Sequence, residues 1–220
     1  MAGLQSVIDK TGFLTINKRK SAGSTVSRSG HIKTSVQQGT VYRFTVGAPQ
    51  GLTYTENKVL LQELDNLDVT VEQQISFGNT NSALTYITEY QGGITNPNLP
   101  GITTIGSQGA NLYVDCSAIT AGSGNMFVTG DFIQPQGNTM TYRYPYQVTA
   151  NVTYQSGPNV TIPVNRPVLS QSGVSLASGN IRIGRNCNWT MICVNMPTYS
   201  VVPHDLLEFS NDFELVEVII

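Results

Sequence analysis

The stretch from Met126 to Leu169 constrains the fold most, because it alternates apolar and polar residues between turn residues and carries almost no charge. Its only Asp, Glu, Lys or Arg residues are Asp131, Arg143 and Arg166. Alternation with a period of two residues is the pattern of half-buried β-strands. Similar short runs recur along the chain at roughly ten-residue spacing, which is typical of a β-sandwich or small barrel. The sequence therefore predicts a mainly β protein with antiparallel strands in a sandwich or barrel.

One segment has the helical period instead. Its apolar residues recur at intervals of four, three and four positions: Leu60, Leu64, Leu67 and Val71. Thr53 and Glu56 have the spacing of a capping box, which marks the first turn of a helix. The pattern predicts a helix at Tyr54–Leu67, and no other long helix is expected.

The surface of such a protein must be polar but largely uncharged. Charged residues make up 12% of the chain, which is about half the usual fraction, and Gly, Ser, Thr, Asn and Gln take their place. Surfaces of this kind suit extracellular β proteins, glycan binders and capsid or tail proteins that assemble. They suit a freely diffusing cytosolic enzyme less well, because charge keeps a monomer soluble.

The charges that are present are unevenly distributed. Residues 10–43 contain seven Lys or Arg and no acid, whereas residues 205–220 contain five acids and no base. The candidate contact residues in these segments are Lys18, Arg19, Lys20, Arg28, Lys33, Glu208, Glu214 and Glu217. Two interpretations stay open: two solvated faces, or a basic edge of one copy that meets an acidic edge of the next. A nucleic-acid site is disfavoured, because the basic segment lacks interleaved aromatic residues and the net charge of the chain is −2.

No motif for catalysis, cofactor binding or metal binding is evident. The sequence lacks HExxH, Walker A, GxGxxG and G-x-S-x-G patterns, so we expect no enzymatic activity, no cofactor and no metal. The only histidines, His31 and His204, are far apart in the sequence, and no local motif pairs either with a cysteine. Cys116, Cys187 and Cys193 are an odd number without zinc-site spacing, which predicts reduced thiols or small buried residues.

Tyr142, Tyr144 and Tyr146 form an aromatic cluster in the segment "TYRYPYQ". Residues at alternate positions share one face of a strand. A tyrosine row on such a face can stack on sugar rings or fill a protein interface, or it can belong to an ordinary half-buried strand. We take the three residues as candidates for a contact surface.

Several segments together resemble tail-associated structural proteins of bacteriophages. Residues 27–68 combine a turn-rich basic strand, an aromatic strand, a short loop and a single helix. Residues 127–169 contain a Gly-Asp hairpin, the strand "VTANV" and a segment ending in "RPVL", and are similar to a small β-barrel insertion in such proteins. The closing "FSNDFELVEVII" resembles the terminal strand that returns to the first β domain in that family.

The resemblance implies a β domain with one packed helix, formed by residues 1–105 and 175–220 and interrupted by a small β-barrel at 106–174. It implies a ring or adaptor component of the tail tube or baseplate, without catalytic residues. The implied partners are other tail and baseplate proteins and copies of the chain itself. A position in the neck or as a head decoration is an alternative within the same class.

The expected location follows from the same class and from the apolar content. The chain has no apolar run of membrane-span length and no signal-peptide core near its start. We therefore expect it to be made in the host cytoplasm and used in the virion tail, without contact with a membrane.

Two other classes of function stay open at this point. A host-recognition or glycan-binding module of a tail fibre would use the tyrosine row. A hydrolase acting on cell wall or capsule would need two carboxylates in a cleft, and the sequence offers least for that reading.

Overall fold

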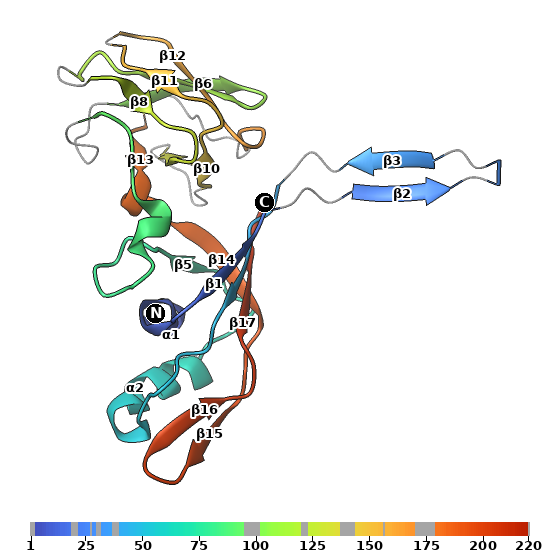
Figure 1. Ribbon diagram of the computed structural model, residues 1–220, viewed down its shortest axis with the longest axis vertical. Coiled ribbons are helices and arrows are strands. Elements are labelled where there is room, and N and C mark those ends of the chain that lie inside the picture. Colours follow the sequence, from blue (N-terminus) through green and yellow to red (C-terminus); the bar gives the residue numbers. More distant parts are fainter. Residues whose placement is uncertain are drawn as a thin grey trace.

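The structure of the chain is a computed structural model that describes residues 3–18, 22–26, 28–29, 32–36, 40–94, 102–119, 123–136, 144–155, 157–169 and 179–219. This part is mainly β, with several antiparallel sheets and two α-helices (Figure 1). The prediction of a mainly β protein is therefore confirmed. The strand pairings of the described residues do not close into a barrel.

The largest sheet has five antiparallel strands. In order across the sheet they are β1 (Leu14–Asn17), β4 (Arg43–Val46), β17 (Phe213–Glu217), β14 (Trp189–Asn195) and β5 (Gln73–Ile75). Burial alternates along β17, where Phe213 and Leu215 are buried and Glu214 between them is exposed. Because β4 and β17 are neighbours, segments far apart in the sequence hold this sheet together.

Two helices contribute to the core on one face of this sheet: α1 (Gly3–Lys10) and α2 (Tyr54–Asp65). The helix predicted at Tyr54–Leu67 is confirmed as α2, which ends two residues earlier. α1 was not predicted, because its eight residues give too short a periodic pattern to recognise in the sequence. The large apolar side chains that α1 buries are Leu4, Val7 and Ile8.

The start of α2 is held by a residue near the other end of the chain rather than by the predicted capping box. The Thr53 hydroxyl donates to the Glu56 carboxylate over 3.0 Å, and it caps no backbone N–H. Instead, the backbone N–H of Thr55 donates to Oδ1 of Asp205 over 3.1 Å, and the N–H of Tyr54 donates to the Asp205 carbonyl over 2.8 Å. A carboxylate at this position is also favoured by the helix dipole.

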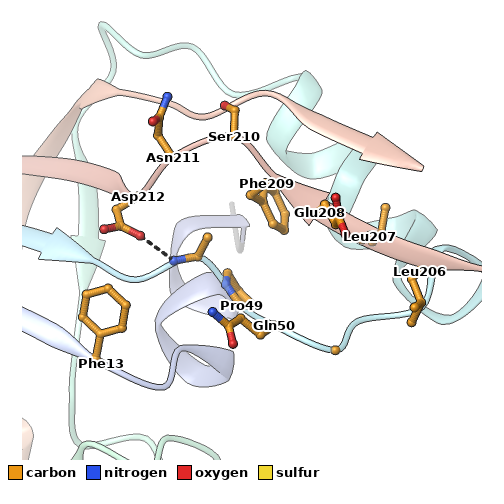
Figure 2. Close-up of a pocket in the computed structure, with 12 residues that line it drawn as sticks. Phe13, Pro49, Gln50, Leu206, Leu207, Glu208, Phe209, Ser210, Asn211 and Asp212 are labelled. Carbon is orange, nitrogen blue, oxygen red and sulfur yellow. Dashed lines mark hydrogen bonds between the residues drawn. The ribbon is translucent and has the colours of Figure 1, made fainter. Parts of the chain in front are cut away.

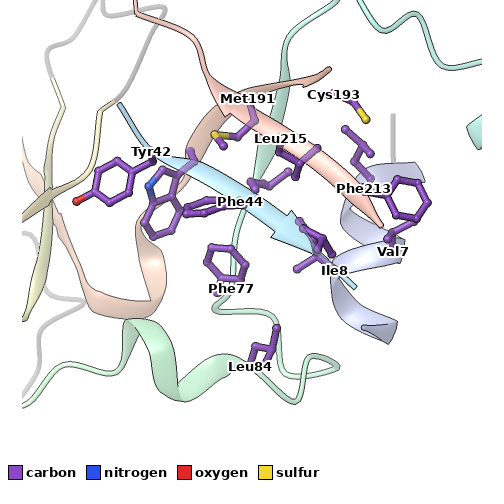
Figure 3. Close-up of a cluster of buried hydrophobic side chains, with 14 of the residues drawn as sticks. Val7, Ile8, Tyr42, Phe44, Phe77, Leu84, Met191, Cys193, Phe213 and Leu215 are labelled. Atoms are coloured by element: carbon purple, nitrogen blue, oxygen red, sulfur yellow. The ribbon is translucent and has the colours of Figure 1, made fainter. Parts of the chain in front are cut away.

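The first hydrophobic core lies between the sheet and the helices, where Phe44 and Phe77 are neighbours (Figure 3). The Trp189 ring contacts four other rings at centroid distances between 5.2 Å and 6.3 Å: Phe77, Phe132, Phe44 and Tyr42. These ring pairs are edge-to-face, the arrangement that aromatic quadrupoles favour. Each such ring buries roughly 150–250 Å², so the cluster supplies much of the hydrophobic stabilisation of this core.

A second group of strands encloses a separate core. Its three small antiparallel sheets consist of β10 (Tyr146–Gln147), β9 (Phe132–Pro135) and β13 (Ile181–Ile183); β11 (Val152–Thr153) and β8 (Asn125–Phe127); and β12 (Val160–Pro163), β7 (Asn111–Asp115) and β6 (Thr103–Gln108). The buried side chains of this core run from Ile94 to Ile183 in the sequence. Phe132 on β9 belongs to the first core, so this strand contributes to both.

Two hairpins and two short 3-10 turns complete the described part. The hairpins are β2 (Ala22–Val26) with β3 (Ile32–Val36), and β15 (Tyr199–Val202) with β16 (Leu206–Phe209). The 3-10 turns are η1 (Thr85–Thr88) and η2 (Gly184–Asn186). We refer to the β2–β3 hairpin as the ribbon.

A buried ion pair joins the two groups of strands. The Arg166 guanidinium, which follows β12, donates to both carboxylate oxygens of Glu217 on β17, over 2.6 Å and 2.7 Å. The two side chains are 1% and 0% exposed. Arg166 also donates to the carbonyls of Thr40 and Pro145. Burial alone would lower the pKa of Arg166, but the hydrogen bond and charge of Glu217 outweigh it and raise that pKa, so Arg166 stays protonated.

Removing one partner of this pair should destabilise the fold strongly. Glu217→Gln leaves the buried Arg166 charge without a counter-ion, and we expect a loss of about 3–5 kcal/mol in the free energy of unfolding. Urea denaturation measures this loss in the free energy of unfolding. Glu89→Gln is the matched control, because it breaks an exposed ion pair with Arg185, and such pairs contribute about 0–1 kcal/mol. A Glu217→Gln variant as stable as the control would contradict the role of the pair.

Candidate functional site

A groove lies at one end of the five-stranded sheet, between the loop after β4 and the β15–β16 hairpin (Figure 2). Its volume is about 510 Å³, within the range of roughly 300–1,000 Å³ that is usual for ligand sites. Phe13, residues 48–51 and residues 206–212 line it. The site is thus assembled from three separate segments of the chain.

Local contacts fix the wall of the groove beside β1 and β4. The backbone N–H of Ala48 donates to Oδ1 of Asp212 over 3.2 Å, the bond drawn as a dashed line in Figure 2. Gly47 has no room for a side chain, because a Cβ there would lie 2.3 Å from the Phe13 ring. Glycine at this position therefore lets the Phe13 ring lie against the backbone.

The groove combines exposed apolar surface with negative charge. Phe13 is 48% exposed and Leu206 is 41% exposed, and the side chain of Glu208 is exposed as well. Asp212 adds a second carboxylate, although one of its oxygens already accepts the Ala48 N–H. This combination fits an apolar segment that carries a positive charge.

The ribbon extends from the opposite end of the same sheet (Figure 1). Its register pairs Ala22 with Val36 and Val26 with Ile32, with Gly, Ser, Thr and Lys at the positions between. Val26 is 69% exposed, and Arg28 in the turn is exposed as well. Within the described part of the chain, the ribbon pairs with no further strand. An isolated two-stranded hairpin is at best marginally stable in water, so a partner would stabilise this one.

The groove and the ribbon are separated because β1 and β4 run between them. In the sequence, Phe13 comes just before β1 and the ribbon comes after β1. The ribbon in turn comes before β4, and residues 48–51 come after β4. Each of these strands has four residues, which span about 13 Å at roughly 3.3 Å per residue. The ribbon of a chain therefore leaves the groove of that chain free.

The predicted basic contact residues fall into different places. Lys18 donates from Nζ to the side-chain oxygen of Gln147, so it links the first sheet to the second group of strands. Arg28 lies exposed in the ribbon turn, and Lys33 belongs to β3. Two of the predicted residues lie outside the described part: Arg19 and Lys20.

The predicted acidic contact residues also separate. Glu208 is exposed at the groove, and Glu214 is exposed on β17. Glu217 is 4% exposed and paired with Arg166, so the prediction that it forms a contact surface is wrong. The physical reason is the alternation along β17, which turns Glu217 to the same side as the buried Leu215.

The predicted tyrosine surface is wrong for the two tyrosines that the structure describes. Tyr144 and Tyr146 are each 1% exposed, and their rings lie 5.9 Å and 5.1 Å from the Arg166 guanidinium. The Tyr146 hydroxyl accepts the backbone N–H of Leu169 over 2.8 Å. The two rings do lie on one side of the segment, but this side faces the buried ion pair. Tyr142 lies outside the described residues.

Other chemistry is limited in the described part of the chain. No three His, Cys, Asp or Glu side chains there are grouped so that they could hold a metal ion. None of the helices found there has the length and apolar character needed to cross a membrane. His204 lies exposed in the β15–β16 turn, while His31 lies outside the described residues.

The groove could not be predicted from the sequence, because its lining residues come together only through long-range contacts: the pairings of β1 with β4 and of β4 with β17, and the bridge between Thr53 and Leu206. The one signal available was the cluster of acids after residue 205.

No protein-family model matches the chain, and no curated protein has a matching sequence.

All three cysteines are buried free thiols, as predicted: Cys116, Cys187 and Cys193. Burial raises the pKa of Cys116 to about 12 and that of Cys193 to about 11. Burial also raises the pKa of Cys187. The thiolate is the form that reacts with disulfide reagents, so none of these residues is a nucleophile at neutral pH.

Thiol titration should show this protection directly. At pH 8 a thiol with a pKa of about 11 is thiolate in about one molecule per thousand, against about a quarter of molecules for an ordinary cysteine. We expect the native protein to react with an aromatic disulfide reagent at least a hundredfold more slowly than the urea-unfolded chain, in which three thiols react. One rapidly reacting thiol in the native protein would contradict the assignment.

Proposed function

We propose that the chain is a structural protein of a bacteriophage virion, a ring or adaptor component of the tail tube or baseplate that acts through contacts between subunits and without catalysis. The observation that carries this proposal is the placement of an acidic groove and a projecting ribbon with an exposed cation at opposite ends of one sheet. Contacts between unlike surfaces join copies head to tail, and they close into rings when the rotation permits. The tail proteins that the sequence resembles are ring or wedge components.

The surface composition supports the same proposal. Formal charges that become buried in an interface are costly unless they are paired, and the centres of interfaces are depleted of charge. A chain with 12% charged residues offers wide polar areas that lose their hydration at lower cost. The few exposed charges at its two ends are then available to set the orientation of neighbouring copies.

The proposal assigns different roles to two parts of the chain. Residues 1–105 and 175–220 form the β domain that assembles, and residues 106–174 form most of an inserted second β unit, whose described strands do not close into a barrel. The second core supports a second unit, and it also takes buried side chains from outside 106–174: Ile94, Ile102 and Ile183. The proposed partners are copies of the chain and other tail or baseplate proteins, and the proposed location is the virion tail after assembly in the host cytoplasm.

The mass of the purified chain in solution, measured by light scattering with electron micrographs of the same fractions, tests the proposal. We expect closed rings, either from the chain alone or after addition of a phage tail extract. Association should weaken as salt rises from about 0.05 M to 0.5 M, because exposed charges are then screened.

A monomer that ignores tail components at every salt concentration would contradict the proposal. Saturable binding of such a species to a surface polysaccharide would favour the glycan-binding alternative instead.

A further inference from the structure

The end of the ribbon exposes an apolar group and a cation close together in the sequence. Val26 is 69% exposed at the end of β2. Arg28 follows two positions later in the turn, and its side chain is exposed. A surface that receives this end must therefore offer apolar contact and negative charge.

The groove offers both apolar contact and negative charge. Its exposed apolar side chains are Phe13 and Leu206, and the carboxylate of Glu208 lies among the same lining residues. A guanidinium has five N–H donors, more than one carboxylate can accept. Gln50 and Asn211 also line the groove (Figure 2), and their side-chain oxygens are acceptors available for the remaining donors.

The two surfaces belong to one chain but lie too far apart to meet within it. The ribbon is attached at the end of the sheet formed by Asn17 and Arg43, and the groove lies beyond Phe13 and Val46 at the other end. A complementary pair of this kind points to a second copy of the chain as the occupant.

We propose that Val26 and Arg28 of one copy bind in the groove of the next copy, with the Arg28 guanidinium beside the Glu208 carboxylate. This inference rests on the proposed function, because it names the partner and the contact surface of the proposed assembly. The contact is heterologous, so each added copy brings one new ribbon and one new groove until a ring closes.

Charge reversal tests the pairing. Arg28→Glu and Glu208→Lys should each weaken association at low salt at least tenfold, which corresponds to about 1.4 kcal/mol. The matched controls are Lys58→Glu on α2 and Glu89→Lys after η1, both at exposed positions away from the groove lining, and we expect less than about a twofold change from either. Circular dichroism and melting temperature verify that each variant folds.

Mixing the Arg28→Glu and Glu208→Lys variants tests more specifically whether these two positions face each other. Copies with Arg28→Glu carry a carboxylate at the end of the ribbon and keep Glu208 in the groove, whereas copies with Glu208→Lys carry an ammonium in the groove and keep Arg28 at the end of the ribbon. An equimolar mixture should therefore assemble as alternating copies at a concentration at which each variant alone stays monomeric. Recovery in the mixture is expected only if the two positions face each other across the contact.

Disulfide trapping provides an independent measurement. Chains with Arg28→Cys mixed with chains with Glu208→Cys should form a covalent dimer under mild oxidation, and the buried native thiols keep the background low. Chains with Lys58→Cys in place of Glu208→Cys are the control. No more dimer than in the control would overturn the inference.

The outcomes separate this inference from the proposed function. If the wild type forms rings but neither charge reversal weakens them, the ribbon-in-groove contact is wrong and the assembly proposal stands. If the wild type forms no assembly, with or without tail extract, both are wrong.

Discussion

The arrangement of the whole described structure depends on the buried ion pair between Arg166 and Glu217. It connects the second group of strands to the central sheet, and it is enclosed by the rings of Tyr42, Tyr144 and Tyr146. Breaking one partner of such a pair leaves a charge stranded in a medium that solvates it poorly. The pair lies at the same end of the sheet as the attachment of the ribbon, and the groove lies at the other end.

The polarity of the sheet follows from this arrangement. One end carries the second group of strands and the ribbon with Arg28, and the other end carries the groove with Glu208. Several acids of the C-terminal segment serve the fold itself, since Asp205 caps α2 and Asp212 accepts a backbone N–H. Of the other acids in this segment, Glu208 is exposed at the groove and Glu214 is exposed on β17.

Local patterns in the sequence were enough to predict the β class, the start of the helix at Tyr54 and the buried cysteines, because periodicity and spacing are properties of short segments. They were not enough to predict that the side chains of Tyr144, Tyr146 and Glu217 are buried. Alternation shows that residues share a face, but it does not show whether that face meets solvent or another part of the chain. The groove could not be predicted for a related reason: its three segments meet only through long-range strand pairing. The uneven distribution of charged residues was visible in the sequence. Which of these residues form contacts inside the fold and which are exposed at the surface was not visible.

The most direct test of head-to-tail assembly is native mass spectrometry of the wild-type chain over a range of concentrations. Heterologous contacts leave free ends, so the account predicts a series of oligomers that grows by single copies or converges on one closed ring larger than a dimer. A dimer that adds no further copies at any concentration would contradict the account, because only a self-complementary contact stops at two.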